Sequence, residues 1–189
     1  MNVARIHWDE IYDSFKDYLA STTQDINYIL SQVSSSAPRT HLDVGCGTGQ
    51  LCRELFHRGY QSTGIDTSGS AVRLAIEATV CPEITYLHTD LDRFSKNQSA
   101  TTFGLITCKY VFAFIEDKAS FVEAVRQRLV EFGVFVLITP DPQQLPKEKI
   151  VISVPHKELI ELLGSAFSVK YLTRGRDVYY ICTILPKKA

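Results

Sequence analysis

The sequence has no excess of either charge and no long apolar run. It carries 20 Lys and Arg against 21 Asp and Glu in 189 residues, so its formal net charge is −1. A balanced charge gives no support to a nucleic-acid or anionic-membrane partner. No apolar stretch approaches the roughly 20 residues of a membrane span, and the first residues lack the apolar core of a secretory signal. We therefore expect a cytoplasmic protein that contacts no membrane.

The cysteines lack the spacing of a metal site or of a disulfide framework. They are odd in number, form no CxxC pair and have no histidine at a zinc-like spacing; they are Cys46, Cys52, Cys81, Cys108 and Cys182. No carboxylate cluster indicates a magnesium site. We expect reduced thiols and no bound metal.

Strand-like and helix-like segments alternate from residue 40 onward, which is typical of an α/β sheet wound through crossover helices. Strands are expected at 40–44, 61–66, 84–90, from 103 and at 133–140, and helices at 49–59, 70–80 and 117–130. A helix over 155–167 and a strand pair over 168–185 follow. The length and the 45% hydrophobic content suit one domain. Residues 1–36 are expected to form one or two helices before this core.

Three glycines follow the first expected strand at alternate positions, in the stretch "THLDVGCGTGQL" from Thr40 to Leu51. Residues without a Cβ permit a sharp turn into a helix and a close approach of a ligand. The pattern is GxGxG, whereas the dinucleotide fingerprint would need its third glycine where Gln50 stands. A nicotinamide-dependent oxidoreductase is therefore only a remote alternative.

Carboxylates stand at the ends of the first three expected strands. Asp43 can receive donors from the glycine loop or from a ligand ammonium, and it would repel a pyrophosphate. Asp66 closes the second strand, about where an acid grasps both hydroxyls of a ribose. Asp90 follows the third strand, where it could equally cap the next turn. Three acids at successive strand ends suit a cationic nucleoside ligand.

In this order and at these separations, "LDVGCGTG", "GIDTS" and "TDL" resemble the class I S-adenosylmethionine-dependent methyltransferases, from about residue 40 to the C-terminus. The resemblance implies a single methyltransferase domain over 1–189, with a helical lid segment in 1–36 and a cofactor-binding core in 40–189. It implies a Rossmann-like three-layer α/β sandwich whose seven-stranded, mostly parallel sheet has the order 3-2-1-4-5-7-6 and one antiparallel strand. The chain departs from the family at Gly104, where an acid is usual, and at 131–133, where Pro-Gly-Gly is common.

The same resemblance implies the cofactor contacts. The methionine part would be held by Asp43 and by the loop residues Gly45, Cys46, Gly47 and Gly49. Asp66, with Thr67 beside it, would hold the ribose, and Asp90 and the backbone of Leu91 would read the adenine edge. Cys108 and Lys109 would border the sulfonium through backbone contacts. Trp8, Tyr12 and Tyr18 could form a lid, with Tyr12 as the preferred lid residue, or the buried stripe of a docked helix.

The methyl donor that the resemblance implies, S-adenosylmethionine, already carries an electrophilic methyl group and leaves as S-adenosylhomocysteine. The protein must then align a nucleophile and exclude water. A hydroxyl acceptor would benefit from His156 or Tyr110 as a base, whereas an amine need only arrive neutral.

The favoured function is transfer of the methyl group to a nitrogen or oxygen of a small molecule, because the charge is balanced and no nucleic-acid module is attached. Methylation of a protein or RNA, and a non-catalytic cofactor-binding partner subunit, are the alternatives. A nucleic-acid partner is not expected, and the protein would be a monomer or a homodimer.

Overall fold

The centre of the computed structural model, which describes residues 8–14, 20–97 and 101–185, is a seven-stranded sheet in the order β3-β2-β1-β4-β5-β7-β6. Strand β7 is antiparallel to β5 and β6, and the other pairs are parallel. This confirms the expected order and the single antiparallel strand. The strands are β1 (Thr40–Val44), β2 (Gln61–Asp66), β3 (Thr85–His88), β4 (Phe103–Lys109), β5 (Leu129–Pro140), β6 (Phe167–Arg174) and β7 (Asp177–Ile184).

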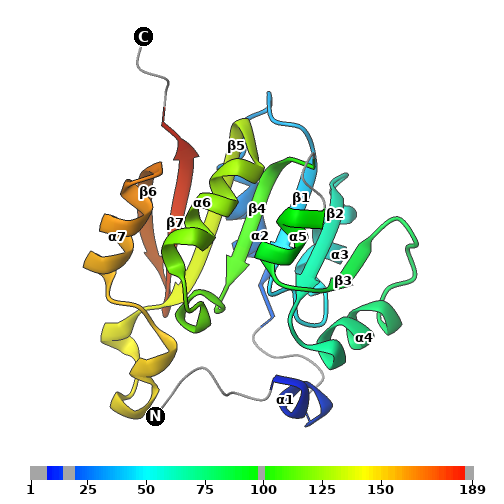
Figure 1. Ribbon diagram of the computed structural model, residues 1–189, viewed down its shortest axis with the longest axis horizontal. Coiled ribbons are helices and arrows are strands. Elements are labelled where there is room, and N and C mark those ends of the chain that lie inside the picture. The colour runs from blue at the N-terminus through cyan, green and yellow to red at the C-terminus, as the bar shows by residue number, and fades with distance from the viewer. Residues whose placement is uncertain (1–7, 15–19, 98–100, 186–189) are drawn as a thin grey trace.

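Helices cover both faces of the sheet and make it a three-layer sandwich (Figure 1). One apolar cluster packs α5, α6 and α7 on one face, and a second packs α2 and α3 on the other. A third joins α3 and α4 beside β3. The helices are α1 (Trp8–Ser14), α2 (Thr23–Ser31), α3 (Gln50–Phe56), α4 (Gly69–Glu77), α5 (Leu91–Asn97), α6 (Lys118–Arg128) and α7 (His156–Gly164). None of the helices in the described part of the chain is long and apolar enough to cross a bilayer.

Three short elements differ from the sequence prediction. Helix α5 was not predicted, because its seven residues bury only Leu91 and Phe94 and so show too little periodicity. Between β5 and α7, where the sequence predicts no helix or strand, the chain forms the 3₁₀ turns η3 (Pro142–Gln144) and η4 (Lys147–Ile152).

Gly104, one of the two places at which the chain departs from the family pattern that it resembles, is required by packing. A Cβ built on Gly104 would collide with the carbonyl oxygen of Pro38, and the Gly104 N–H donates to the hydroxyl of Thr40 at 3.0 Å. A side chain of any kind would push the segment before β1 away from β4. The departure therefore concerns local packing, away from the glycine loop.

The carboxyl ends of β1 to β4 lie at one edge of the sheet, and α1 lies beyond that edge (Figure 1). In open α/β sheets this edge is where ligands bind. The described parts of the N-terminal segment, α1 and α2, confirm the expected helices; residues 1–7 and 15–19 of that segment lie outside the described residues.

Candidate functional site

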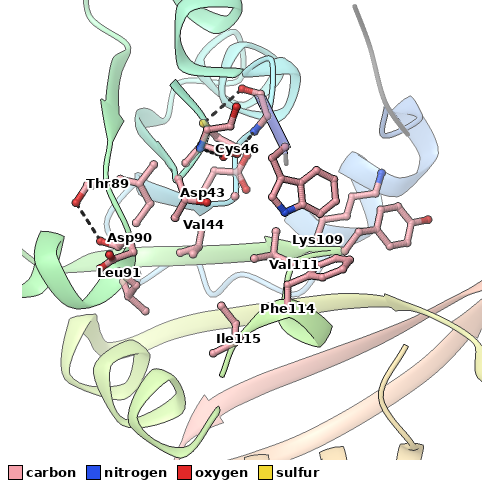
Figure 2. A pocket seen from close by; sticks show the side chains of 18 of the residues that line it. Asp43, Val44, Cys46, Thr89, Asp90, Leu91, Lys109, Val111, Phe114 and Ile115 are labelled. Carbon is pink, nitrogen blue, oxygen red and sulfur yellow. Dashed lines mark hydrogen bonds between the residues drawn. The ribbon is translucent and has the colours of Figure 1, made fainter. Parts of the chain in front are cut away.

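A cleft of about 1260 Å³ lies at this edge of the sheet. Figure 2 shows Asp90 and Leu91 on one side of it, Lys109 on the other, and Asp43 and Val44 between them. Its walls combine the glycine loop, the ends of β1 to β4, helix α1 and the start of α6. Of the expected cofactor residues, those that line the cleft are Tyr12, Asp43, Gly45, Cys46, Gly47, Asp66, Thr67, Asp90, Leu91 and Lys109.

The bare backbone of the glycine loop admits neighbouring side chains. Gly47 has a φ of 54°, and a Cβ on it would lie 2.7 Å from the hydroxyl oxygen of Tyr12. A Cβ on Gly45 would collide with Val111, and one on Gly49 with the hydroxyl of Tyr86. The three glycines therefore make room for side chains of the protein itself as well as for a ligand. Gly49 does not line the cleft.

The amide groups of this loop are already used within the protein. The N–H groups of Gly45 and Cys46 donate to the carbonyl of Ile65 at 2.8 and 3.0 Å, and Gly49 N–H donates to the Cys46 carbonyl at 2.9 Å. Gly47 N–H donates to Asp66 Oδ2 at 2.9 Å. A pyrophosphate at such a loop needs amides that point at it. The arrangement therefore supports the argument against a dinucleotide cofactor.

Asp43 lies at the base of the cleft, almost completely buried. Its Oδ1 accepts the hydroxyl hydrogen of Thr107 at 2.6 Å, and its Oδ2 has, among the described residues, only a weak contact with the Cys52 thiol at 3.9 Å. Burial raises the pKa of Asp43 to about 6, and the nearby Asp66 adds to this effect. A cation in the cleft would offset both the burial of the Asp43 charge and its repulsion by Asp66, so the site favours a positively charged ligand group.

Asp66 ties the glycine loop to the start of α4. Its two oxygens accept the N–H groups of Gly47 and Ser68, each at 2.9 Å. Burial raises the pKa of Asp66, while these donors oppose the shift. Each carboxylate oxygen has a second lone pair, so Asp66 can still accept a ligand hydroxyl.

Asp90 makes the capping contact that was left open as an alternative. Its Oδ1 accepts the N–H of Arg93 at 2.8 Å at the start of α5. Its side chain is nevertheless 42% exposed, and it lines the cleft together with the buried Leu91. Capping and ligand contact are therefore compatible.

At the end of β4, Lys109 and Cys108 differ in exposure. Cys108 is fully buried and does not line the cleft, whereas Lys109 does. The Lys109 ammonium donates to the hydroxyl of Ser21 at 3.0 Å. Gln50, the first residue of α3, makes two reciprocal hydrogen bonds of 2.9 Å with the Ser21 backbone. These contacts fasten the segment before α2 to the cleft.

Helix α1 lies across the mouth of the cleft. Asp9 accepts the Ser68 hydroxyl at 2.6 Å and the Ser70 N–H at 3.1 Å, and the Ser68 hydroxyl holds the pKa of Asp9 below its usual value. Trp8 packs edge-on against Phe114 with ring centroids 5.0 Å apart. None of the seven α1 residues is fully buried. The helix therefore bridges the two walls of the cleft.

The two candidate bases are not brought together. Tyr110 lines the cleft, but its φ is 59° and its hydroxyl donates to Asp177 at 2.6 Å. Burial, together with this bond, raises the pKa of Tyr110, so the phenol stays protonated. His156 is absent from the cleft lining, because its Nδ1 pairs with the Tyr180 hydroxyl at 2.8 Å and its ring packs on Tyr171. The structure gives no support to His156 as a base.

Sequence reasoning missed several residues that shape the site. Ser68 and Asp9 had a detectable signal, since a serine before a helix and acids in a first turn are common capping patterns. His41, Thr107, Ser21 and Gln50 had none, because their partners are distant along the chain. In the part of the chain that the structure describes, no three His, Cys, Asp or Glu side chains are placed to hold a metal.

This sheet order, with a GxGxG loop and acids at successive strand ends, defines a class I S-adenosylmethionine-dependent methyltransferase fold. The family profile described as "Methyltransferase domain" matches residues 42–137. The chain belongs to this family and is an S-adenosylmethionine-dependent methyltransferase. Its cofactor is S-adenosylmethionine, and the buried acids at the base of the cleft fit a cationic ligand.

The chain is similar to two curated proteins named "Ubiquinone biosynthesis O-methyltransferase". The one from Pasteurella multocida is 28% identical over an alignment of 189 positions, which covers 94% of this chain and 72% of that protein. The one from Nitrosomonas europaea is 24% identical over 177 residues, which cover 92% and 69%.

Solved structures of methyltransferases share the fold. A TehB-like S-adenosylmethionine-dependent methyltransferase from Corynebacterium glutamicum aligns with a TM-score of 0.68 at 16% identity, over 94% of each chain. The plantazolicin methyltransferase BpumL, solved with S-adenosylhomocysteine, also gives 0.68 at 16% identity, over 84% of this chain and 80% of that one. At this identity the likeness shows the fold alone.

Proposed function

We propose that this methyltransferase transfers the methyl group to a hydroxyl oxygen of a small, largely apolar acceptor. The observation that carries the proposal is the cleft itself. Small-molecule sites occupy about 300 to 1,000 Å³, so about 1260 Å³ leaves room for an acceptor beside the methyl donor. The names of the curated relatives favour oxygen over nitrogen as the accepting atom.

The wall beyond the glycine loop has the composition expected of an apolar acceptor site. Beside the polar Glu116, Asp117 and Ser120, six apolar side chains from the segment after β4, from α6 and from η4 line it: Val111, Phe114, Ile115, Phe121, Ala124 and Ile152. Apolar and aromatic linings with few polar groups are typical of small-molecule sites. An acceptor with a hydroxyl on a ring or on an apolar chain fits this lining.

On the donor side, Asp43 would accept from the ammonium of the methionine part and Asp66 from the ribose hydroxyls. Asp90 and the backbone of Leu91 would receive the adenine edge, and Gly45, Cys46, Gly47 and Lys109 would border the rest. Gly49 would support the loop through Tyr86, with Thr67 beside Asp66. When bound, the cofactor supplies an electrophilic methyl group.

The residues of the chain then bind, orient and exclude water. Trp8 and Tyr12 on α1 would close over the donor, and this closure would align the acceptor. Alignment of this kind supplies on the order of 7 to 11 kcal/mol. Tyr110 would be a wall of the acceptor site and not its base, because its hydroxyl is held by Asp177. Cys108 would shape this wall from behind.

A small acceptor is also favoured over a protein or RNA. Helix α1 spans the mouth between Ser68 and Phe114, so a bulky partner would have to displace it. The free cysteines of the described chain are consistent with a cytoplasmic location. That location, and a monomeric or homodimeric state, belong to the proposal.

The test is to incubate the protein with methyl-labelled S-adenosylmethionine and ring-matched pairs of acceptors, one phenol and one aniline in each pair. A second sample contains a fractionated cell extract, and Asp66→Asn serves as the blank. Label on phenols, or in low-mass extract fractions with an O-methyl mass shift, is the expected result. Label confined to anilines, or to protein and RNA fractions, would contradict the proposal.

A further inference from the structure

Four buried polar side chains form a continuous chain across β2, β1 and β4. Ser62 Oγ lies 3.2 Å from His41 Nδ1, and His41 Nε2 lies 2.8 Å from Thr107 Oγ1. Thr107 Oγ1 in turn lies 2.6 Å from Asp43 Oδ1. The strand register places Ser62 beside His41 and Thr107 beside Asp43. The chain therefore leads from the middle of the sheet to the base of the cleft.

The hydrogen positions in this chain follow from what each group can donate. An ionised Asp43 only accepts, so Thr107 must give its one hydroxyl hydrogen to Oδ1. The Thr107 oxygen must then accept from His41, which makes His41 the Nε2–H tautomer. His41 Nδ1 is left to accept the Ser62 hydroxyl. Burial lowers the pKa of His41 to about 3, so the ring carries no charge.

The surroundings of Asp43 explain why an ordered donor matters there. Asp66 on β2 opposes its ionisation and Lys109 on β4 favours it. The thiols that face it, Cys46, Cys52 and Cys108, are neutral because burial raises the pKa of each. Among the described residues, Thr107 makes the one short hydrogen bond to this carboxylate.

We propose that Thr107 and His41 are positioning residues for the methyl donor: the ordered chain holds Asp43 ionised through Oδ1 and leaves Oδ2 for the ammonium of S-adenosylmethionine. This inference rests on the proposed role of Asp43. A neutral His41 contributes its donor without placing a positive charge beneath a cationic ligand. The histidine thus orders the chain and adds no electrostatic repulsion.

A purely structural role for the chain makes a different prediction. Removing the Thr107 hydroxyl would then lower stability and leave the pH dependence of cofactor binding unchanged. In the positioning role, loss of the hydroxyl raises the pKa of Asp43, so more of the carboxyl is protonated at neutral pH. Binding of the ammonium would then weaken and recover only at higher pH.

The experiment is calorimetric titration with S-adenosylhomocysteine between pH 5 and 8. Thr107→Val removes the hydroxyl and keeps nearly the same side-chain shape, and the separate variant Thr107→Ser keeps the hydroxyl. We expect Thr107→Val to bind about tenfold more weakly at pH 7, as for loss of a hydrogen bond to a charged group, with its pH midpoint moved upward. Thr107→Ser should bind as the wild type does. An unmoved pH midpoint in Thr107→Val, whatever its affinity, would overturn the inference, because a purely structural role predicts that result.

Three further measurements separate this inference from the role of Asp43 and guard against misfolding. Asp43→Asn should bind weakly at every pH; wild-type affinity there would remove the proposed role of Asp43 itself. His41→Gln can donate to Thr107 and accept from Ser62, so it should bind far better than His41→Leu. Nitrogen-15 NMR of the folded wild type should show the neutral Nε2–H tautomer, and the Nδ1–H tautomer would overturn the ordered chain.

Discussion

Asp66 Oδ2 accepts the backbone N–H of Gly47 at 2.9 Å, so the candidate ribose-binding carboxylate also holds the glycine loop in place. Its other oxygen accepts from Ser68 at the start of α4. One side chain therefore links β2, the glycine loop and α4. A substitution at Asp66 should disturb both the ligand contact and the loop.

Asp66→Asn should weaken S-adenosylhomocysteine binding at least tenfold. The asparagine amide presents a donor where the carboxylate accepts, so the N–H of either Gly47 or Ser68 loses its partner. Calorimetric titration measures the affinity, and circular dichroism checks that the fold is kept. Glu123→Gln, at an exposed ion pair on α6, is the control and should bind normally. Unchanged affinity in Asp66→Asn would remove the ribose assignment.

Asp9→Asn should speed the dissociation of S-adenosylhomocysteine by about threefold to tenfold. The substitution weakens the bonds to Ser68 and Ser70 that fasten α1 across the cleft, each a contribution of about 0.5 to 1.5 kcal/mol. Stopped-flow fluorescence of Trp8, the single tryptophan, reports the release. Asp13→Asn is matched on the same helix, and its exposed ion pair with Arg73 contributes little. Equal rates in the two variants would argue against a lid.

Gly104→Ala should lower the free energy of unfolding by about 1 to 3 kcal/mol, the usual cost of an overpacked core position. The added methyl group meets the Pro38 carbonyl, which is backbone and cannot turn away. Urea unfolding measures the loss. Gly164→Ala, at an exposed helical glycine with no atom within 4 Å of the new Cβ, is the control and should gain stability. A Gly104→Ala protein as stable as the wild type would refute the packing argument.

The stability of the wild type should fall relative to His41→Gln as the pH drops below about 6.5. Native His41 stays neutral down to its pKa of about 3, whereas in the unfolded chain His41 binds a proton near its ordinary pKa of 6.5. Protons therefore favour the unfolded state in this window, with a slope of about 1.4 kcal/mol per pH unit. The titration of Asp43 has the opposite effect on stability, but it occurs in both proteins and cancels in the comparison. Parallel stability curves between pH 4 and 7 would show that His41 is not buried as a neutral ring.

Local signals in the sequence identified most of the frame. The alternation of strands and helices, the bare loop after β1 and the acids at three strand ends all lie within short segments. Strand and turn preferences act over a few residues, so they can be recognised there without knowledge of the fold. Helix α5 was not predicted, because its seven residues are too few to show a helical period.

The pairings within the site came only from the tertiary structure. Thr107 and His41 are 66 residues apart, Tyr110 and Asp177 are 67 apart, and Asp9 and Ser68 are 59 apart. The chemistry of each side chain is written in the sequence, but its partner is chosen when the sheet brings distant strands side by side. The sequence by itself therefore determined the methyltransferase fold and the positions of the acidic residues at its strand ends. The tertiary structure decided which donors hold those acids, and it turned Tyr110 and His156 toward other partners.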